Sequence, residues 1–192
     1  IIVSILPIDT GRYGTKEMLD IFREQKKIDY QLDIEAAAAL SQSEIGLIPA
    51  SVAKDISRIA KSGKITAKRI KQLESKSDHD TAALVEALAE KCKTESRPWI
   101  HYGLTSNDLV DTSNSMQMRD AIKIIQPKVS KLSLILAKNA VKHKSVPAVG
   151  RTHGQHASII SFGLKFANWA SEMSTHLERL DEIKKRVLIC KT

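Results

Sequence analysis

The stretch Gly150–Ala157 (GRTHGQHA) holds two imidazoles, a guanidinium, an amide and a hydroxyl within eight residues. A long segment with apolar residues at helical spacing follows it directly. We therefore predict that this cluster lies in a short connection that leads into a helix N-terminus. The free N–H groups and the positive dipole end of such a terminus favour a bound anion.

Two other polar clusters precede this stretch in the sequence. They are Ser77–Asp80 (SDHD) and His101–Asp108 (HYGLTSND). Each comes just before a segment with helical apolar spacing, so each is expected to be a loop at a helix start. We expect the three loops to converge on one anionic ligand.

The segment 157–189 is predicted to be one long helix. Its apolar residues alternate between spacings of three and four, which is typical of a helix in a bundle or coiled coil. These residues are Ile159, Phe162, Phe166, Trp169, Met173, Leu177, Leu180, Ile183 and Val187. About 34 residues at 1.5 Å each give a length on the order of 50 Å. Such a helix is too long to be buried in one globule of 192 residues, so it implies packing against more chain or against other subunits.

Apolar spacing, caps and breakers predict helices in the rest of the chain as well. We expect them at about 15–46, 51–61, 66–75, 80–92 and 107–142, with Thr15, Ser51 and Thr66 as the N-caps of the first three and Pro127 inside the last. Residues 1–14 are expected to be irregular and residues 146–152 extended. The predicted fold class is all-α, with a small helical domain over 1–104 followed by the first long helices of a bundle over 105–192.

Composition narrows the classes of partner. The 30 Lys and Arg against 22 Asp and Glu give a net charge of +8. This balance suits nucleic acid, acidic lipid or a multiply charged anionic metabolite, although most of these lysines fit a solvated helix face.

Cys92 and Cys190 form no CxxC motif, so we expect two reduced thiols in a cytoplasmic protein. No apolar run reaches the length of a membrane span. The sequence begins without methionine, so further residues are expected in front of it.

His153 is the foremost catalytic candidate of the chain. Imidazole side chains are the commonest proton-transfer groups in enzymes, so His153 can transfer a proton to a ligand, although it can also serve only to hold its loop by hydrogen bonds. His156 follows three residues later, and a His-x-x-His pair raises the possibility of a metal. No carboxylate lies within seven residues to complete a ligand set, so we expect no metal.

The other candidates each have a structural alternative. Asp78-His79-Asp80 fits a ligand-contacting imidazole oriented by a carboxylate. It fits helix capping equally well, with Asp78 or Asp80 accepting first-turn N–H groups and His79 exposed. Thr105 and Ser106 stand at a helix start, where hydroxyl and N–H groups can hold a carboxylate or cap the helix.

Near the start of the chain, Arg12-Tyr13 can clamp a phosphate through the planar guanidinium. On its own this pair is a weak signal.

Together these segments resemble the adenylosuccinate lyases, a branch of the fumarase/aspartase/argininosuccinate lyase superfamily. The matching segments are RYGTKEM (12–18), SDHD (77–80), HYGLTSNDLVDT (101–112), GRTHGQHA (150–157) and FGLKFANW (162–169). GRTHGQHA indicates the superfamily, whereas HYGLTSNDLVDT together with RYGTKEM indicates this branch. The Arg- and Asn-rich middle motif of argininosuccinate lyases is absent.

The resemblance implies a cofactor-free elimination. Fumarate leaves adenylosuccinate to give AMP, and it leaves the succinylaminoimidazole carboxamide ribotide of purine biosynthesis in the same way. A base removes a proton beside a carboxylate and an acid protonates the leaving nitrogen, so groups that hold the intermediate anion matter. On this mapping His153 and His79 are catalytic, with His153 the general acid. His79, with Asp78 and Asp80, also orients the nucleotide.

The remaining ligand contacts follow from the same resemblance. Thr105 and Ser106 hold a succinyl carboxylate, Arg12 and Tyr13 meet the phosphate, and Thr152 and Gln155 lie near the substrate. The family is a cytoplasmic homotetramer whose sites combine loops of three subunits. The expected partners are therefore the anionic succinyl nucleotide and other copies of the chain, with no nucleic acid and no membrane.

The chain departs from the family pattern in two ways. A Pro-Thr-Thr segment often follows GRTHGQHA in the family, whereas Ser158-Ile159-Ile160-Ser161 stands here, which leaves the start of the next helix open. Family members are also more than twice as long, and the loop that supplies their proposed base has no counterpart in this sequence. We therefore expect the sequence to be the N-terminal portion of an enzyme and to lack lyase activity by itself.

Two other readings remain open. One is a fumarate-releasing lyase that acts on a different amine, which would have no need of Arg12 and Tyr13 as a phosphate clamp. The other is a basic helical scaffold or nucleic-acid-binding protein, whose affinity would fall steeply with salt.

Overall fold

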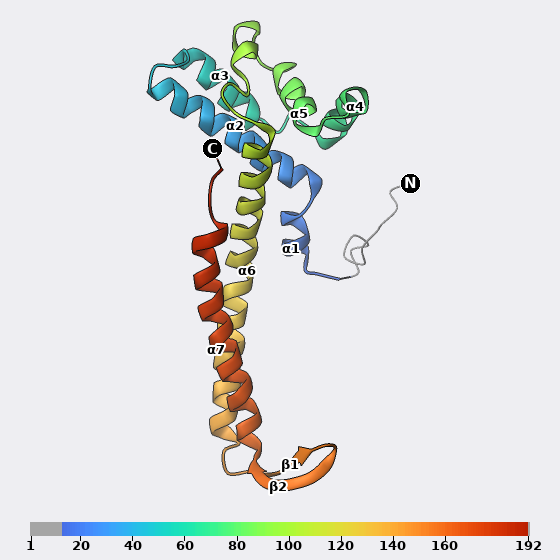
Figure 1. The fold of residues 1–192 in the computed structure, drawn as a ribbon, viewed down its shortest axis with the longest axis vertical. Coiled ribbons are helices and arrows are strands. Elements are labelled where there is room, and N and C mark those ends of the chain that lie inside the picture. Colours follow the sequence, from blue (N-terminus) through green and yellow to red (C-terminus); the bar gives the residue numbers. More distant parts are fainter. Residues whose placement is uncertain (1–12, 192) are drawn as a thin grey trace. The chain divides into compact units, whose positions relative to one another are not determined.

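The computed structural model describes residues 13–191, which form two compact units. The first unit comprises the chain up to residue 120 together with the segment from 188 onward, and the second comprises residues 121–187. The elements, shown in Figure 1, are α1 Lys16–Ile21, α2 Glu24–Glu44, α3 Ala50–Ala60, α4 Ala67–Ser77, α5 Asp80–Ala89, η2 Thr94–Trp99, α6 Ser106–Lys142, β1 Pro147–Thr152, β2 Gln155–Ser161 and α7 Phe162–Val187. The all-α class is therefore confirmed, with one small hairpin added. Between residues 13 and 191, no helix combines the length and the apolar character that a membrane crossing requires.

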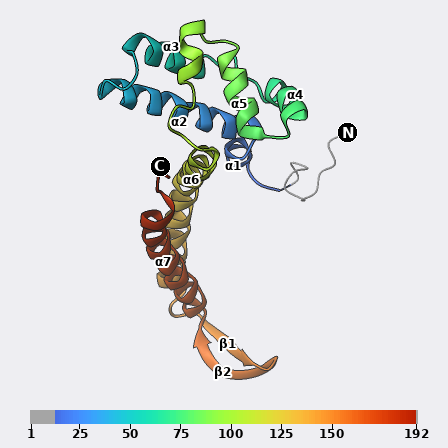
Figure 2. The same cartoon turned by 45° about the horizontal axis from the view of Figure 1, so that its top comes forward.

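The core of the first unit lies among helices α2, α3 and α5. Helix α2 packs along α3, and α4 packs along α5 (Figure 2). The largest apolar side chains that are almost wholly buried are Ile56, Leu84, Leu88 and Leu109. They come from α3, α5 and the start of α6, so α6 is anchored in this core.

Helix starts in the first unit follow the expected cap chemistry at two positions. Thr15 accepts the Met18 N–H at 3.4 Å ahead of α1, and Thr66 accepts the Arg69 N–H at 3.3 Å ahead of α4, as predicted. The predicted cap at Ser51 is wrong, because α3 begins one residue earlier and Pro49 takes the cap position. Proline is suited to a helix start because it lacks the N–H that would be unpaired there.

The predicted helix 107–142 is confirmed as α6, which runs continuously through Pro127. In the second unit α6 and α7 are joined by side-chain contacts. Gln126 donates to Asp181 at 3.0 Å and accepts from Lys184 at 2.5 Å. The Ser133 hydroxyl donates to the Ala170 carbonyl at 3.5 Å.

The segment around GRTHGQHA is a β-hairpin, so the prediction of a connection into a helix N-terminus is wrong. Strands β1 and β2 pair antiparallel, with Thr152 opposite Gln155. His153 and Gly154 form the two-residue turn with φ of 50° and 75°. Two successive positive φ values match the right-handed twist of paired strands, which favours a hairpin. The expectation that residues 146–152 are extended is confirmed by β1.

Helix α7 begins at Phe162 rather than at 157, so it has 26 residues instead of about 34. Ser161 fixes this start, because its hydroxyl accepts the Gly163 N–H at 3.1 Å and donates to the Lys144 carbonyl at 2.6 Å. Ser161 belongs to the segment that stands where the family often has Pro-Thr-Thr. Its hydroxyl is therefore a helix cap.

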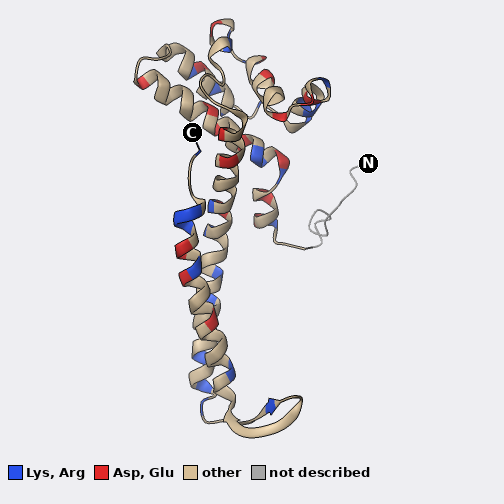
Figure 3. Cartoon of the chain, viewed as in Figure 1, with Lys and Arg blue, Asp and Glu red and all other residues tan. Residues whose placement is uncertain are grey.

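The excess positive charge of the chain belongs to the second unit. Residues 121–187 contain twelve Lys and Arg against four Asp and Glu, whereas the rest of the chain contains eighteen of each. Figure 3 shows the basic residues of this unit along α6, the hairpin and α7. The net charge of +8 is thus a property of the long helices and the hairpin.

Candidate functional site

His79 is held at the start of α5 by its own ring. Its Nδ1 accepts the Ala82 N–H at 3.2 Å, which makes the imidazole the N-cap of this helix. A neutral imidazole that accepts at Nδ1 carries its proton on Nε2. His79 therefore presents an N–H donor away from α5, and its side chain is about half exposed, at 52%.

The two aspartates beside His79 have different surroundings. Asp80 accepts the Thr81 N–H at 2.6 Å in the first turn of α5, and its carboxylate lies 3.8 Å from His79 Nδ1. Asp78 ends α4 in the left-handed conformation, and its N–H donates to the Glu74 carbonyl at 2.8 Å. Both carboxylates are exposed. The capping alternative thus holds for Asp80, whereas the cap position itself is taken by His79, which was not expected. Capping uses neither the Nε2 atom of His79 nor the Asp78 carboxylate.

The Thr105–Asp108 segment is a tightly bonded start of α6. The buried Asp108 carboxylate accepts the Thr105 N–H at 2.7 Å, while the Asp108 N–H donates to the Thr105 carbonyl at 3.0 Å. This reciprocal arrangement resembles a capping box, in which the side chain three residues into the helix reaches back to the cap. The Asp108 N–H thus bonds to the backbone carbonyl of Thr105 and not to its hydroxyl.

The structure brings two of the three clusters together. Ser106 Oγ lies 3.5 Å from His79 Nε2, across 27 residues of sequence. With the ring proton on Nε2, His79 donates and the hydroxyl accepts. His79 and Thr105 are exposed and Ser106 is partly exposed, so all three are accessible from solvent.

The hairpin belongs to the second unit and presents its polar side chains to solvent. Thr152, His153, Gln155 and His156 are all exposed. His153 stands in the two-residue turn, with its backbone in the left-handed conformation. That this third cluster meets the other two at one ligand stays a prediction.

Of the two residues predicted to clamp a phosphate, Arg12 and Tyr13, the structure describes only Tyr13. Arg12 lies outside the described residues. Tyr13 precedes α1 and its side chain is 55% exposed. Its role at a phosphate also stays a prediction.

Backbone conformation marks the same three clusters. Among residues 13–191, the residues other than glycine with positive φ are Asp78, His101 and His153, at 50°, 61° and 50°. A side chain in this region costs about 1–3 kcal/mol and persists only where the surroundings enforce it, often at functional sites. Each cluster that the sequence analysis singled out contains one such residue.

The sequence analysis missed a buried ion pair behind the second cluster. Glu35 on α2 is 2% exposed, and its carboxylate accepts from both the N–H and the ring Nδ1 of His101, at 3.0 and 2.5 Å. The hydrogen bond to Glu35 raises the pKa of His101, and the negative charges of Glu35 and Asp108 act in the same direction. A signal was present, because Glu35 interrupts the apolar side of α2 that Ile28, Leu32 and Ala39 form.

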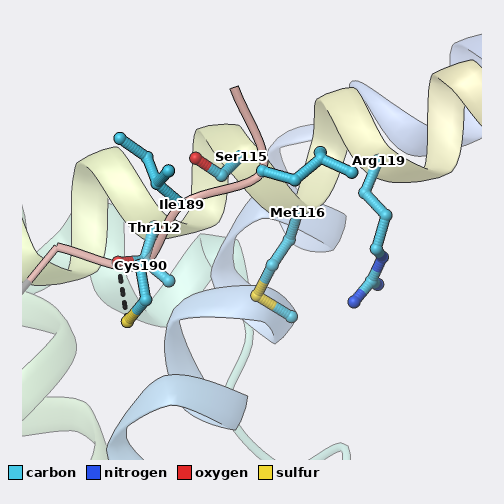
Figure 4. A pocket seen from close by; sticks show the side chains of 7 residues that line it. Thr112, Ser115, Met116, Arg119, Ile189 and Cys190 are labelled. Carbon is cyan, nitrogen blue, oxygen red and sulfur yellow. Dashed lines mark hydrogen bonds between the residues drawn. The ribbon is translucent and has the colours of Figure 1, made fainter. Parts of the chain in front are cut away.

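Two hollows lie near α6 in the first unit. One groove of about 420 Å³ is lined by Ile34, Ala37, Ala38, Leu104, Asp108 and Met116, among others. A cavity of about 180 Å³ adjoins it, and Figure 4 shows Arg119 and Met116 beside the returning segment with Ile189 and Cys190. That segment is fixed by the Thr112 hydroxyl, which accepts the Lys191 N–H at 3.1 Å. Neither hollow is lined by a predicted site residue.

No cluster of three or more His, Cys, Asp or Glu residues suited to a metal ion occurs in the described part of the chain. The polar groups that are present are hydrogen-bond donors and acceptors. They comprise an imidazole N–H, two hydroxyls and two carboxylates in the first unit, and the histidine of the turn in the second.

Comparison with known proteins extends the resemblance over almost the whole chain. A family model described as Lyase matches residues 11–192. An adenylosuccinate lyase of Methanocaldococcus jannaschii is 44% identical over 187 residues, covering 97% of this chain and 40% of that protein. An N-acetyl-S-(2-succino)cysteine lyase of Enterococcus italicus is 39% identical, covering 92% of this chain and 39% of that protein.

A solved structure agrees with these matches. The crystal structure of a fumarate lyase from Mesorhizobium sp. BNC1 superimposes with a TM-score of 0.86 at 32% identity, covering 93% of this chain and 43% of that one. The chain thus spans about 40% of the length of the curated relatives that it matches. Since the family model matches from residue 11 to the last residue, the protein belongs to this lyase family.

Proposed function

We propose that the protein functions as an adenylosuccinate lyase, to which this chain contributes the N-terminal portion. It would release fumarate from adenylosuccinate to give AMP, and from the succinylaminoimidazole carboxamide ribotide in the same way. The observation that carries this proposal is the 3.5 Å approach of Ser106 Oγ to His79 Nε2, which joins two of the three sequence clusters at one exposed surface. The 44% identity to the Methanocaldococcus adenylosuccinate lyase supports the choice of substrate.

The reaction breaks one C–H bond and one C–N bond. A base takes the proton beside a succinyl carboxylate, the carbon–nitrogen electron pair leaves with the nitrogen, and an acid protonates that nitrogen. Between these steps negative charge collects on the carboxylate, so donors that face it stabilise the intermediate. The Ser106 and Thr105 hydroxyls, beside the N-terminus of α6, are our proposed donors.

The two histidines have separate proposed roles. His79 acts as a donor that orients the nucleotide, because the Ala82 N–H occupies its Nδ1 and leaves a proton on Nε2. On substrate binding this proton, which faces Ser106 Oγ in the free chain, is shared with the nucleotide. Asp78 and Asp80 flank it at the same substrate. His153 is the general acid, and Thr152 and Gln155 flank it opposite each other at the base of the turn. Arg12 and Tyr13 are proposed at the phosphate.

We further propose a cytoplasmic homotetramer in which residues of several subunits complete each site. The second unit supports this assembly, since α6 and α7 carry large apolar side chains that are about half exposed. Examples are Leu134 at 61%, Ile135 at 46% and Trp169 at 46%. The proposed domain boundary at 104/105 separates the small helical domain from the long helices that would form the bundle.

The test replaces the matched 40% of the Methanocaldococcus enzyme with residues 1–192 and follows fumarate release from adenylosuccinate. His153→Asn is the informative variant, because asparagine tolerates the left-handed turn and removes the imidazole. We expect the parent chimera to be active and His153→Asn to lose at least about a hundredfold in kcat, the usual scale for a general acid. The matched control is His156→Asn, which makes the same change on an exposed strand residue and should retain activity.

The same assay separates the competing functions. Release of fumarate from N-acetyl-S-(2-succino)cysteine, and none from adenylosuccinate, would assign the chain to the activity for which the Enterococcus relative is named. A folded chimera that acts on neither substrate would overturn the proposal. Tight binding of nucleic acid by the 192-residue chain, weakening steeply with salt, would instead support the basic-scaffold alternative.

A further inference from the structure

Glu35 is the most deeply buried charged side chain that touches any of the three clusters. It lies on α2 with 2% of its surface exposed. Both of its carboxylate oxygens form hydrogen bonds with one residue, His101. A carboxylate is costly to bury unless it is paired and hydrogen-bonded. The pair therefore stabilises one particular arrangement of the loop that His101 begins.

His101 needs such a partner because of its backbone. Its φ of 61° is unfavourable for a residue with a side chain. The Glu35 carboxylate binds the His101 N–H at 3.0 Å and the ring at 2.5 Å, so backbone and side chain are fixed together.

The rest of the loop is also held from α2. Gln42 donates to the Tyr102 carbonyl at 2.7 Å, and Gln42 stands seven residues after Glu35, two turns further along the same side of the helix. The Leu104 N–H closes the turn onto the His101 carbonyl at 3.2 Å. The loop then ends at Thr105, whose N–H is held by Asp108, and at Ser106, which meets His79.

We propose that Glu35 is a positioning residue, which through His101 sets the place of Thr105 and Ser106 against His79. The proposal rests on the function proposed above, in which these two hydroxyl residues hold a substrate carboxylate. The charged groups that act on the His101 ring in the described residues are Glu35 from α2 and Asp108 from the start of α6. Both are acidic, so the loop is held most firmly while the imidazole is protonated, and it loosens when the ring loses its proton.

Histidine-specific ¹⁵N labelling of the 192-residue chain tests this inference without substrate. The chain has six histidines, so each ring gives a separable signal, and His79 Nε2 reports on Ser106 through their direct contact. Glu35→Gln removes the charge and keeps the size of the side chain. We expect the midpoint of the His101 titration to fall toward that of a free imidazole, and the His79 Nε2 signal to shift although Glu35 does not touch His79.

Glu44→Gln is the matched control, since it makes the same change at the exposed end of the same helix and should move neither signal. Should Glu35→Gln fail to fold, Glu35→Asp keeps the charge, and His101→Asn keeps a donor in the left-handed position. Glu35→Asp should preserve the elevated His101 midpoint, and His101→Asn should shift the His79 signal. A His79 signal unchanged by the loss of either partner would overturn the proposal.

The chimera adds a kinetic readout. Loss of the Glu35 charge should raise KM for adenylosuccinate about tenfold or more, the effect of one weakened hydrogen bond to a charged group. The effect should grow less marked as the pH rises, because the parent loop itself loosens when His101 loses its proton. A chimera inactive on both substrates would contradict the proposed function, whereas the histidine signals would still decide whether Glu35 positions the loop.

Discussion

Asp78, His101 and His153 share a backbone conformation that their side chains disfavour, with φ between 50° and 61°. This conformation falls mostly to glycine, and among the other residues asparagine, aspartate and histidine adopt it most often. Here an aspartate and two histidines occupy it, each in a different polar cluster. His101 is kept for its bond to the buried Glu35. At the exposed Asp78 and His153 glycine would fit the backbone better, so we infer that these two side chains are kept for contact with a ligand.

Asp78→Gly is therefore expected to stabilise the fold. The exposed residue ends α4 at φ 50°, and glycine there should raise the free energy of unfolding by about 1 kcal/mol. Lys71→Gly, in the exposed interior of the same helix, should lower it by a similar amount. Urea unfolding of both variants measures the pair. Destabilisation by both would mean that the Asp78 carboxylate itself supports the fold.

The Glu35–His101 pair predicts how stability depends on pH. The hydrogen bond to Glu35 raises the pKa of His101 above its ordinary value of 6.5 in the folded chain. The folded state therefore binds this proton more tightly than the unfolded state does. The resulting stability is fully present below pH 6.5 and is lost as the pH rises through the elevated pKa.

Urea midpoints measured from pH 6 upward should therefore decline through the His101 titration in the parent chain. His101→Asn should show a flatter profile and a lower stability at the acidic end. Cys92, whose pKa is raised to about 11 mainly by burial, contributes only at much higher pH. Equal slopes in the parent and the variant would show that this pair does not govern the pH dependence.

At the scale of elements, the sequence predicted helices well and the hairpin poorly. Apolar spacing placed α4 and α6 with small errors at their ends, because each helix lays one apolar side on a core. The single helix predicted over 15–46 was wrong, because α1 ends at Ile21 and α2 begins at Glu24. The hairpin was missed because Ile159 continues the spacing of Phe162 and Phe166, as if one helix ran through all three. His153-Gly154 is the part of the sequence that could have indicated the hairpin. Glycine at the second central position is typical of a two-residue hairpin turn.

The candidate site was predictable in its residue types and only partly in its geometry. His79 and Ser106 were both named from their motifs, and their approach to 3.5 Å spans 27 residues, which no local pattern encodes. His79 as the cap of α5, in place of an aspartate, was also beyond the sequence, because imidazoles seldom take that position. Glu35 was overlooked because a single charge on a helix is usually read as exposed.

The junction between hairpin and α7 gives a prediction for one hydroxyl. Ser161→Ala removes the acceptor of the Gly163 N–H and the donor to the Lys144 carbonyl, so it should lower the free energy of unfolding by about 1 kcal/mol. Ser174→Ala, at an exposed position inside α7, should have a far smaller effect. Thermal unfolding compares the two. Equal effects would mean that the bonds of Phe162 and Gly163 to the preceding turn suffice to start α7.

At the scale of the whole molecule, charge and apolar surface coincide in the second unit. Residues 121–187 carry the entire net charge of +8, and they also expose several large apolar side chains. An exposed apolar surface of this kind marks an interaction site. Positive charge on the same surface opposes the approach of identical copies, so two forces of opposite sign act on any self-association.

This balance predicts how association responds to salt. The 192-residue chain should sediment as a species larger than 21.3 kDa, and added salt should strengthen association because it screens the lysines while burial of apolar surface remains. Leu134→Glu, at a side chain 61% exposed on α6, should weaken association, and Ile45→Glu, at a side chain 78% exposed beyond the end of α2, should not. Sedimentation velocity at low and high salt measures both variants. Binding of a nucleic acid would respond to salt in the opposite direction. The affinity of the chain for nucleic acid would fall as the ionic strength rises, because each neutralised phosphate releases counterions. A chain that stays monomeric at every salt concentration would contradict the proposed assembly and leave the apolar side of α6 without its expected partner.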